Sequence, residues 1–249
     1  MIVKAETSQA EKVGSVAENV KRVYERMQQA AERVGRDPAE VRLVAASKMV
    51  EAARLRAAIA AGVKILGENY LQEARKKIGQ LGLHAAEWHC IGALQRNKIR
   101  YIFDLFSMVH AVDRLALAEE INRRGERLGR QMAILLEVNI GGEESKSGFT
   151  PHALQAEIEQ FAAMPHVQVR GLMTIPPPTP TPEGARPFYQ ELRQLRDRLS
   201  QRGIEGLDFT ELSMGMTADF EVAIEEGATL VRVGTAIFGP RPSAQTHEG

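Results

Sequence analysis

The chain has 249 residues, of which 44% are hydrophobic and 26% charged, the composition of a globular protein with a full core. Its 32 basic residues balance 32 acidic ones, which excludes the strongly basic footprint of a nucleic-acid binder. No apolar run approaches the length of a membrane span or a signal peptide, and the single Cys90 excludes an internal disulfide, so we expect a cytoplasmic protein.

A long amphipathic helix is expected first, over residues 8–34, after a flexible stretch at 1–7. Apolar residues recur there every three or four positions, with charged residues between them. Ser8 and Glu11 have the spacing of a capping box, and Gly35 ends the segment. Because this helix precedes the first strand, it should lie on the outside or at the bottom of the core.

From residue 41 onward, short apolar strands alternate with single helices. The expected strands are 41–47, 63–66, 87–91, 105–109, 132–140, 167–174, 207–212 and 229–233. Helices are expected near 51–61, 70–78, 95–103, 113–128, from 151, at 183–200 and at 217–226, with an eighth only indicated at 235–238. Single intervening helices indicate a parallel sheet, and eight such steps favour one closed (β/α)8 TIM barrel over residues 8–239.

An alternative fold and two short segments complete the predicted organisation. A Rossmann-type open sheet is the alternative fold, but Ala46-Ser47-Lys48 after the first strand is not a glycine fingerprint. The proline-rich stretch 176–182 is interpreted as a rigid connector, and the tail 240–249 as disordered.

In a parallel barrel, reactive groups collect where the strands end, because the loops that follow converge there. This rule groups Lys48, Asn69, His89, Gln95, Asn139, Lys146, Met173, Ser213, Gly215, Arg232, Gly234 and Thr235. Only Glu68 and Glu137 supply carboxylates nearby, which disfavours paired-carboxylate hydrolysis. His89 and His110 lack a third ligand, so hydrogen-bonded core histidines are favoured over a metal site.

Two glycine-containing segments indicate a phosphate site. Ser213-Met214-Gly215 and Gly234-Thr235-Ala236 each offer backbone N–H groups beside a hydroxyl, after the seventh and eighth strands where barrels bind phosphate. Lys48, at the end of the first strand, would face them, although an isolated lysine is more often a surface residue.

An amine opposite a phosphate anchor suggests a phosphorylated aldehyde held as a Schiff base. Pyridoxal 5′-phosphate (PLP) is the favoured cofactor, and a phosphosugar aldolase intermediate is the rival. Arg232 could bond the pyridine nitrogen and, because it stays charged, would keep that nitrogen unprotonated and the ring a poor electron sink. A structural salt bridge is the alternative role for Arg232.

Several long motifs resemble the pyridoxal phosphate homeostasis protein family, which is related in fold to the N-terminal barrel of alanine racemase. The motifs are Ala46-Ser47-Lys48, the stretches 67–73, 88–98, 145–149 and 171–176, Leu212-Ser213-Met214-Gly215-Met216, and the stretch 231–239. The resemblance implies that Lys48 carries PLP as a Schiff base and that Arg232 faces the pyridine nitrogen. It further implies that Ser213, Gly234 and Thr235 bind the phosphate and that Asn69 lies beside the ring.

The resemblance favours a PLP carrier without strong catalytic activity, concerned with PLP homeostasis and with amino-acid and keto-acid balance. The partners of this carrier would be PLP and PLP-dependent apoenzymes; it would bind neither nucleic acid nor a membrane. A PLP-dependent amino-acid racemase and a cofactor-independent aldolase are the alternatives. A racemase of this fold needs a tyrosine from an added β-domain, and only ten residues follow Gly239, so we expect a monomeric binding protein.

Overall fold

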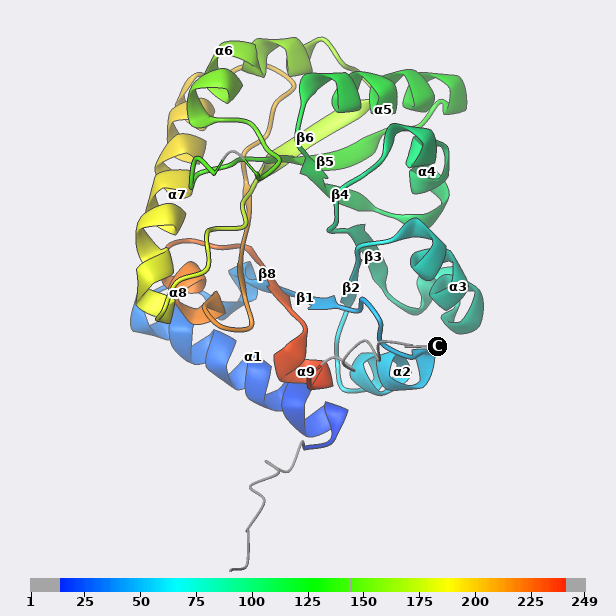
Figure 1. Cartoon of the computed structure of the whole chain (residues 1–249), viewed down its shortest axis with the longest axis vertical. Helices are drawn as coiled ribbons and strands as arrows, with labels where there is room; N and C mark the ends of the chain where they lie inside the picture. The colour runs from blue at the N-terminus through cyan, green and yellow to red at the C-terminus, as the bar shows by residue number, and fades with distance from the viewer. Residues whose placement is uncertain (1–13, 144, 241–249) are drawn as a thin grey trace, which may run out of the picture.

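The computed structural model describes residues 14–143 and 145–240, which form a closed barrel of eight parallel strands in sequence order (Figure 1). The strands are β1 (Arg42–Ala46), β2 (Ile65–Glu68), β3 (Glu87–Cys90), β4 (Met108–Val112), β5 (Met132–Glu137), β6 (Val167–Met173), β7 (Glu211–Met216) and β8 (Leu230–Val233). The predicted (β/α)8 barrel is therefore confirmed.

Helices surround the strands. They are α1 (Val16–Arg33), α2 (Ala52–Ala60), α3 (Leu71–Leu81), α4 (Ile102–Leu105), α5 (Leu115–Leu128), α6 (Pro151–Ala162), α7 (Arg186–Gln201), α8 (Phe220–Glu225) and α9 (Thr235–Phe238). In the described part of the chain, four short 3-10 turns accompany them: η1 (Pro38–Glu40), η2 (Leu83–Ala85), η3 (Arg96–Tyr101) and η4 (Pro182–Ala185).

The apolar core has two layers because parallel barrel strands are buried on both faces. A small inner cluster fills the barrel with one side chain or two from most strands: Val44, Ile65, Ile91, Met108, Ala111, Leu135, Met173 and Leu230. A larger outer cluster lies between the strands and the helices. Buried polar side chains share the barrel interior with this inner cluster, namely His89, His110, Ser213 and Arg232.

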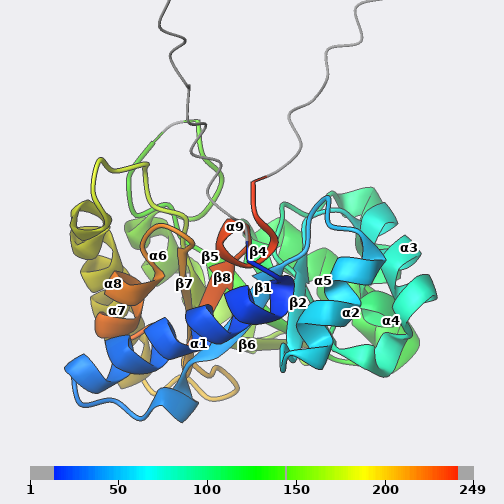
Figure 2. The same ribbon diagram turned by 90° about the horizontal axis from the view of Figure 1, so that it is seen from below.

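Helix α1 takes the position that a long eighth helix would occupy. Because α9 has only four residues, it cannot cover β8 and β1, and α1 packs there against α8, α9 and α2 (Figures 1 and 2). Val20, Val23 and Met27 form its buried stripe, and the buried Asn19 donates from Nδ2 to the Ile237 carbonyl at 2.9 Å. The expected position on the outside of the core is confirmed.

Some predicted boundaries were wrong. Helix α1 begins at Val16, with Ser15 and Glu18 as its capping box. The predicted cap residues Ser8 and Glu11, the predicted flexible stretch 1–7 and the tail 241–249 lie outside the described residues. Strand β4 begins at Met108 because residues 102–105 are helical.

Strand β7 also starts later than predicted, at Glu211, where pairing with Gly171 of β6 begins. Of the residues that suggested a strand there, Phe209 belongs to the outer core cluster and Leu207 packs against it. As a result, Ser213 and Met214 lie within the strand rather than in a loop after it.

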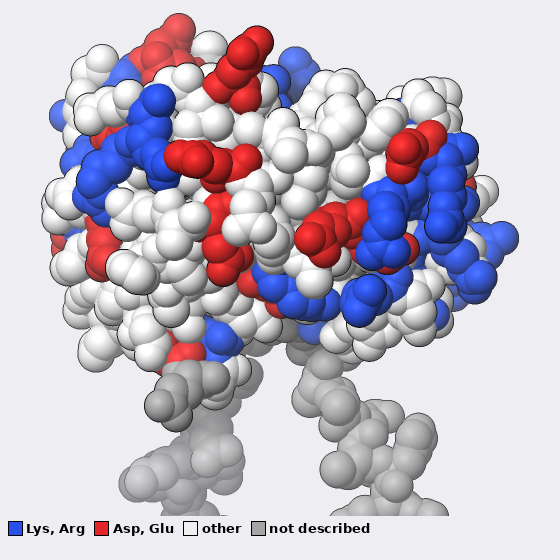
Figure 3. Space-filling model, turned by 90° about the horizontal axis from the view of Figure 1, so that it is seen from above, with Lys and Arg blue, Asp and Glu red and all other residues white. Residues whose placement is uncertain are grey.

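The surface carries both signs of charge. On the face shown in Figure 3, acidic and basic side chains are interspersed across the surface. Within the described residues, no helix combines the length and the apolarity needed to cross a bilayer.

Candidate functional site

The loops after β1 and β8 meet at the carboxyl end of the barrel. Ala45 pairs with Val233, so Lys48 and the segment Gly234–Thr235 follow neighbouring strands. The two loops touch closely, since a Cβ atom added to Gly234 would lie 3.4 Å from the Cβ of Ala46. The structure therefore brings together the turn that carries Lys48 and one of the two predicted anion-binding segments.

The turn that carries Lys48 has an unusual backbone. Met49 has φ = 60°, and it is the one non-glycine residue with positive φ in the described ranges. Its N–H donates to Glu73 Oε1 at 2.5 Å, and the Lys48 Nζ lies 5.0 Å from the centre of the Tyr70 ring. Contacts with the β2–α3 segment thus hold the Lys48 turn.

A buried ion network lies behind this turn. Lys77 Nζ donates to the Ser47 carbonyl at 2.5 Å, to Glu68 Oε1 at 2.6 Å and to Glu73 Oε1 at 2.7 Å. Ser47 Oγ also donates to Glu68 Oε1, at 2.7 Å. Glu68 is 0% exposed, and burial raises its pKa more than the bonds from Lys77 and Ser47 lower it. The network fixes the residues on both sides of Lys48.

Arg232 lies inside the mouth of the barrel and is 5% exposed. Its two terminal nitrogens donate to Ser213 Oγ at 2.6 Å and to the Thr174 carbonyl at 2.9 Å. Burial lowers its pKa, although a guanidinium remains charged at neutral pH. Within the described residues no carboxylate forms a salt bridge with it, so the salt-bridge alternative is not what the structure shows.

The two predicted β7 residues have different surroundings. The fully buried Ser213 hydroxyl contacts Arg232 and His110 in the barrel interior, not an open rim. The Met214 side chain packs in the outer core, because successive side chains of a strand alternate between its faces. Neither side chain lies at the surface of the mouth.

Thr217, which the sequence did not single out, lies against the α9 segment instead. Its Oγ1 accepts from the N–H groups of Gly234 and Ala236 at 3.3 and 3.5 Å, and Thr235 beside them is exposed. The Thr217 and Thr235 hydroxyls and these N–H groups together make this segment a candidate for binding an anion. In the sequence, the only feature that pointed to Thr217 was its position four residues after Ser213.

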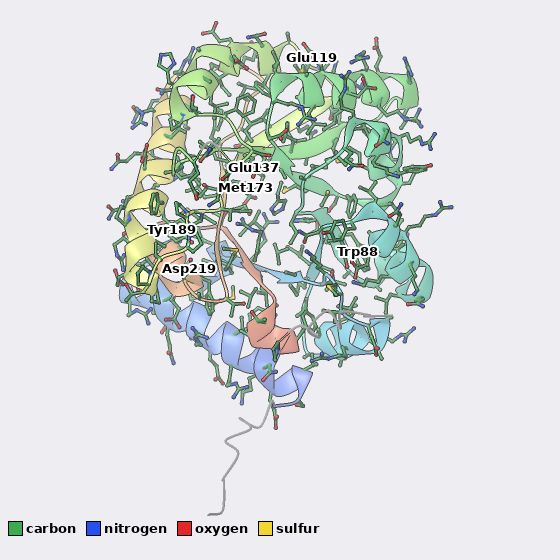
Figure 4. All side chains as sticks on the ribbon, viewed as in Figure 1. Trp88, Glu119, Glu137, Met173, Tyr189 and Asp219 are labelled. Carbon is green, nitrogen blue, oxygen red and sulfur yellow. The ribbon has the colours of Figure 1, made fainter. Side chains whose placement is uncertain are left out.

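A cavity of about 320 Å³ opens at the β2–β6 side of the mouth, lined by Asn69, Glu137, Asn139, Lys146 and Met173 among others. Figure 4 shows Glu137 beside Met173, its partner in the β5–β6 ladder. Burial, reinforced by the charge of Asp113, raises the pKa of Glu137 to about 6, while Arg232 opposes this shift.

Asn69 and Lys146 are held differently in that cavity. Asn69 is positioned through Gly92, where a Cβ atom would lie 2.8 Å from the Asn69 Cα. Lys146 forms an ion pair with Glu143.

His89 and His110 are buried and hydrogen-bonded, as predicted, and the structure shows that they bond to each other. His89 Nδ1 and His110 Nε2 are 2.9 Å apart, and both side chains are buried. Burial lowers the pKa of His89 to about 3 and that of His110 well below its ordinary value, so both rings are neutral. The described residues contain no group of three metal-ligating side chains.

Comparisons with known proteins show which proteins this chain is similar to in sequence and in structure. A family model described as "Alanine racemase, N-terminal domain" matches residues 18–242. The pyridoxal phosphate homeostasis protein of Aquifex aeolicus is 44% identical over 91% of this chain and 99% of its own. That of Pseudomonas aeruginosa is 44% identical over 92% and 97%. The structure of PipY from Synechococcus elongatus, solved with PLP bound, has a TM-score of 0.78 at 37% identity, over 90% of this chain and 100% of PipY.

Proposed function

Because the chain belongs to the pyridoxal phosphate homeostasis protein family, with the barrel of the alanine racemase N-terminal domain, we propose that it binds PLP at the carboxyl end of its barrel. The single observation that carries the proposal is the contact between the ends of β1 and β8, which lead into Lys48 and into Gly234–Thr235, next to the buried guanidinium of Arg232.

This chain has a matching group for each of three parts of PLP: the aldehyde, the pyridine nitrogen and the phosphate. Lys48 offers an amine for the aldehyde, and Arg232 offers a charged donor for the pyridine nitrogen. Thr217 and Thr235 offer hydroxyl donors for the phosphate, beside the Gly234 N–H, which donates to Thr217 Oγ1 in this structure and would turn to the phosphate. Asn69 would lie beside the ring, and Ser213 and Met214 would support the site from within β7, Ser213 through Arg232.

PLP supplies an aldehyde that forms a Schiff base with an amine, and a ring whose electron demand depends on protonation of its nitrogen. Arg232 donates hydrogen bonds and has no proton to give up at neutral pH, so it keeps the pyridine nitrogen unprotonated. Lys77 and Glu73 hold the backbone on either side of Lys48. These residues favour holding PLP over strong carbanion chemistry.

The names of the relatives, together with this chemistry, support a cellular role. We propose a PLP carrier that maintains the supply of the cofactor, hands it to PLP-dependent apoenzymes and so influences amino-acid and keto-acid balance. The carrier would be a cytoplasmic monomer. An amino-acid racemase is the competing role, and racemisation that Lys48→Ala abolishes would favour it.

Absorption spectroscopy with borohydride trapping tests the proposal. The protein loaded with PLP should absorb in the visible range, and reduction should fix the cofactor on the peptide that contains Lys48. Lys48→Ala should lose the visible band and the adduct, whereas Lys76→Ala, on the exposed face of α3, should retain both. An adduct on Lys146, or none at all, would overturn the assignment.

A further inference from the structure

A row of hydrogen-bonding side chains crosses the interior of the barrel. Arg232 donates to Ser213 Oγ at 2.6 Å, and Ser213 Oγ is 2.9 Å from His110 Nδ1. His110 Nε2 is 2.9 Å from His89 Nδ1, and His89 Nε2 faces the Glu87 carboxylate at 3.9 Å. Glu87 is half-exposed at the amino-terminal end of β3, so the row runs from the mouth to the opposite end of the barrel.

The hydrogens in this row can be assigned by accounting for every donor. Arg232 has donors only, so Ser213 Oγ accepts from it and must place its own hydrogen elsewhere. Ser213 is wholly buried, and its remaining partner is His110 Nδ1, which therefore accepts. His110 is neutral, so its hydrogen is on Nε2 and points to His89 Nδ1. His89 then carries its hydrogen on Nε2, toward Glu87.

The opposite assignment is unfavourable at both ends. It would leave the Ser213 hydrogen buried without an acceptor, which lowers the population of that state by a factor of about ten or more. It would also turn the lone pair of His89 Nε2 toward a carboxylate. Arg42, whose charge helps to keep both rings neutral, and its partner Glu211 lie at the same end as Glu87.

We infer that Ser213, His110 and His89 form a one-directional hydrogen-bonded chain that holds Ser213 as a fixed acceptor for Arg232, so that His110 is a positioning residue of the cofactor site. The inference rests on the proposed PLP site for its functional consequence, but not for the direction of the chain. Ser213 and the Thr174 carbonyl together fix both terminal nitrogens of the guanidinium, which sets the orientation of its remaining N–H groups.

Nitrogen NMR of histidine-labelled protein tests the direction without any added cofactor. Long-range proton–nitrogen spectra distinguish a protonated ring nitrogen from one with a lone pair, and His110→Asn identifies the His110 signals among the six histidines. We expect protonated Nε2 and unprotonated Nδ1 in both His89 and His110. A protonated Nδ1 in His110 would overturn the inference.

PLP affinity of two variants tests the positioning role. His110→Leu removes the acceptor for the Ser213 hydroxyl and should weaken PLP binding about tenfold. His110→Asn retains an oxygen close to the position of Nδ1 and should bind nearly as well as the unmodified protein. His152→Asn, on the exposed surface of α6, is the matched control and should change nothing.

Ranking the two His110 variants by PLP affinity and by unfolding temperature separates a positioning role from simple packing. In an apolar interior, leucine should preserve the unfolding temperature better than asparagine, whereas the positioning role predicts that asparagine preserves PLP affinity better. If affinity follows unfolding temperature instead, the positioning role is wrong. Should His110→Leu not fold, the pair Ser213→Ala and Ser213→Thr asks the same question. Failure of the unmodified protein to bind PLP would refute the proposed function and leave the NMR result intact.

Discussion

The buried ion network behind Lys48 makes a quantitative prediction about Lys77→Met. The substitution keeps an unbranched side chain but removes the only cation that contacts the fully buried Glu68 among the described residues. Removing one partner of a buried ion pair typically costs about 3–5 kcal/mol. The large cost arises because the remaining charge has neither water nor a counter-ion.

Proton uptake by Glu68 limits this cost and makes it depend on pH. From the ordinary pKa of 4.5, protonating the carboxyl costs about 3.4 kcal/mol at pH 7 and about 0.7 kcal/mol at pH 5. In the variant the folded-state pKa lies above the unfolded value. The free energy of unfolding of the variant therefore falls as pH rises from 4.5. Lys77→Met should be destabilised by about 3 kcal/mol at pH 7 and by much less at pH 5.

Urea unfolding at the two pH values measures both numbers. Lys76→Met, the neighbouring exposed lysine of α3, is the matched control and should change stability by less than about 0.5 kcal/mol. Adding Glu68→Gln to Lys77→Met should recover most of the loss at pH 7, because a neutral amide needs no counter-ion. An equal loss at both pH values, or no recovery in the double variant, would refute the reasoning.

Three further predictions concern other buried groups. Glu137→Gln should abolish a loss of stability of about 2 kcal/mol between pH 4.5 and 7, because the folded-state pKa of Glu137 is raised to about 6; urea titrations that show the same slope in both proteins would contradict it. Asn19→Ala should cost about 1–2 kcal/mol by leaving the Ile237 carbonyl without its donor, and an unchanged thermal midpoint would exclude that role. Burial raises the pKa of the Cys90 thiol to about 12, so a thiol reagent should label it only after denaturation, and rapid labelling of the native protein is the contrary outcome.

The periodicity of the sequence predicted the barrel because the apolar pattern of each strand and helix can be read from its own residues. The ends of β1 and β8 were predictable as neighbours, since the ends of adjacent parallel strands must meet. Ser213 could not be placed, because the start of β7 depends on its ladder with β6 rather than on local composition. The roles of Asn69, Ser213, Met214 and Arg232 toward PLP stay predictions.

Lys77 and Thr217 were missed for a related reason. Lys77 lies in an ordinary amphipathic helix, and only the approach of α3 to the Lys48 turn buries its amine. Thr217 belongs to the candidate site because it accepts a hydrogen bond from Gly234, which lies 17 residues away in the sequence. The partners of such residues are decided by packing, which no local pattern records.

The place of α1 joins distant parts of the chain in a way that bears on biosynthesis. The helix is made long before α8 and α9, on which it packs, and the Asn19–Ile237 bond joins residues 218 positions apart. During synthesis, the part of the apolar stripe of α1 that packs on α8 and α9 therefore stays uncovered until those two helices have formed.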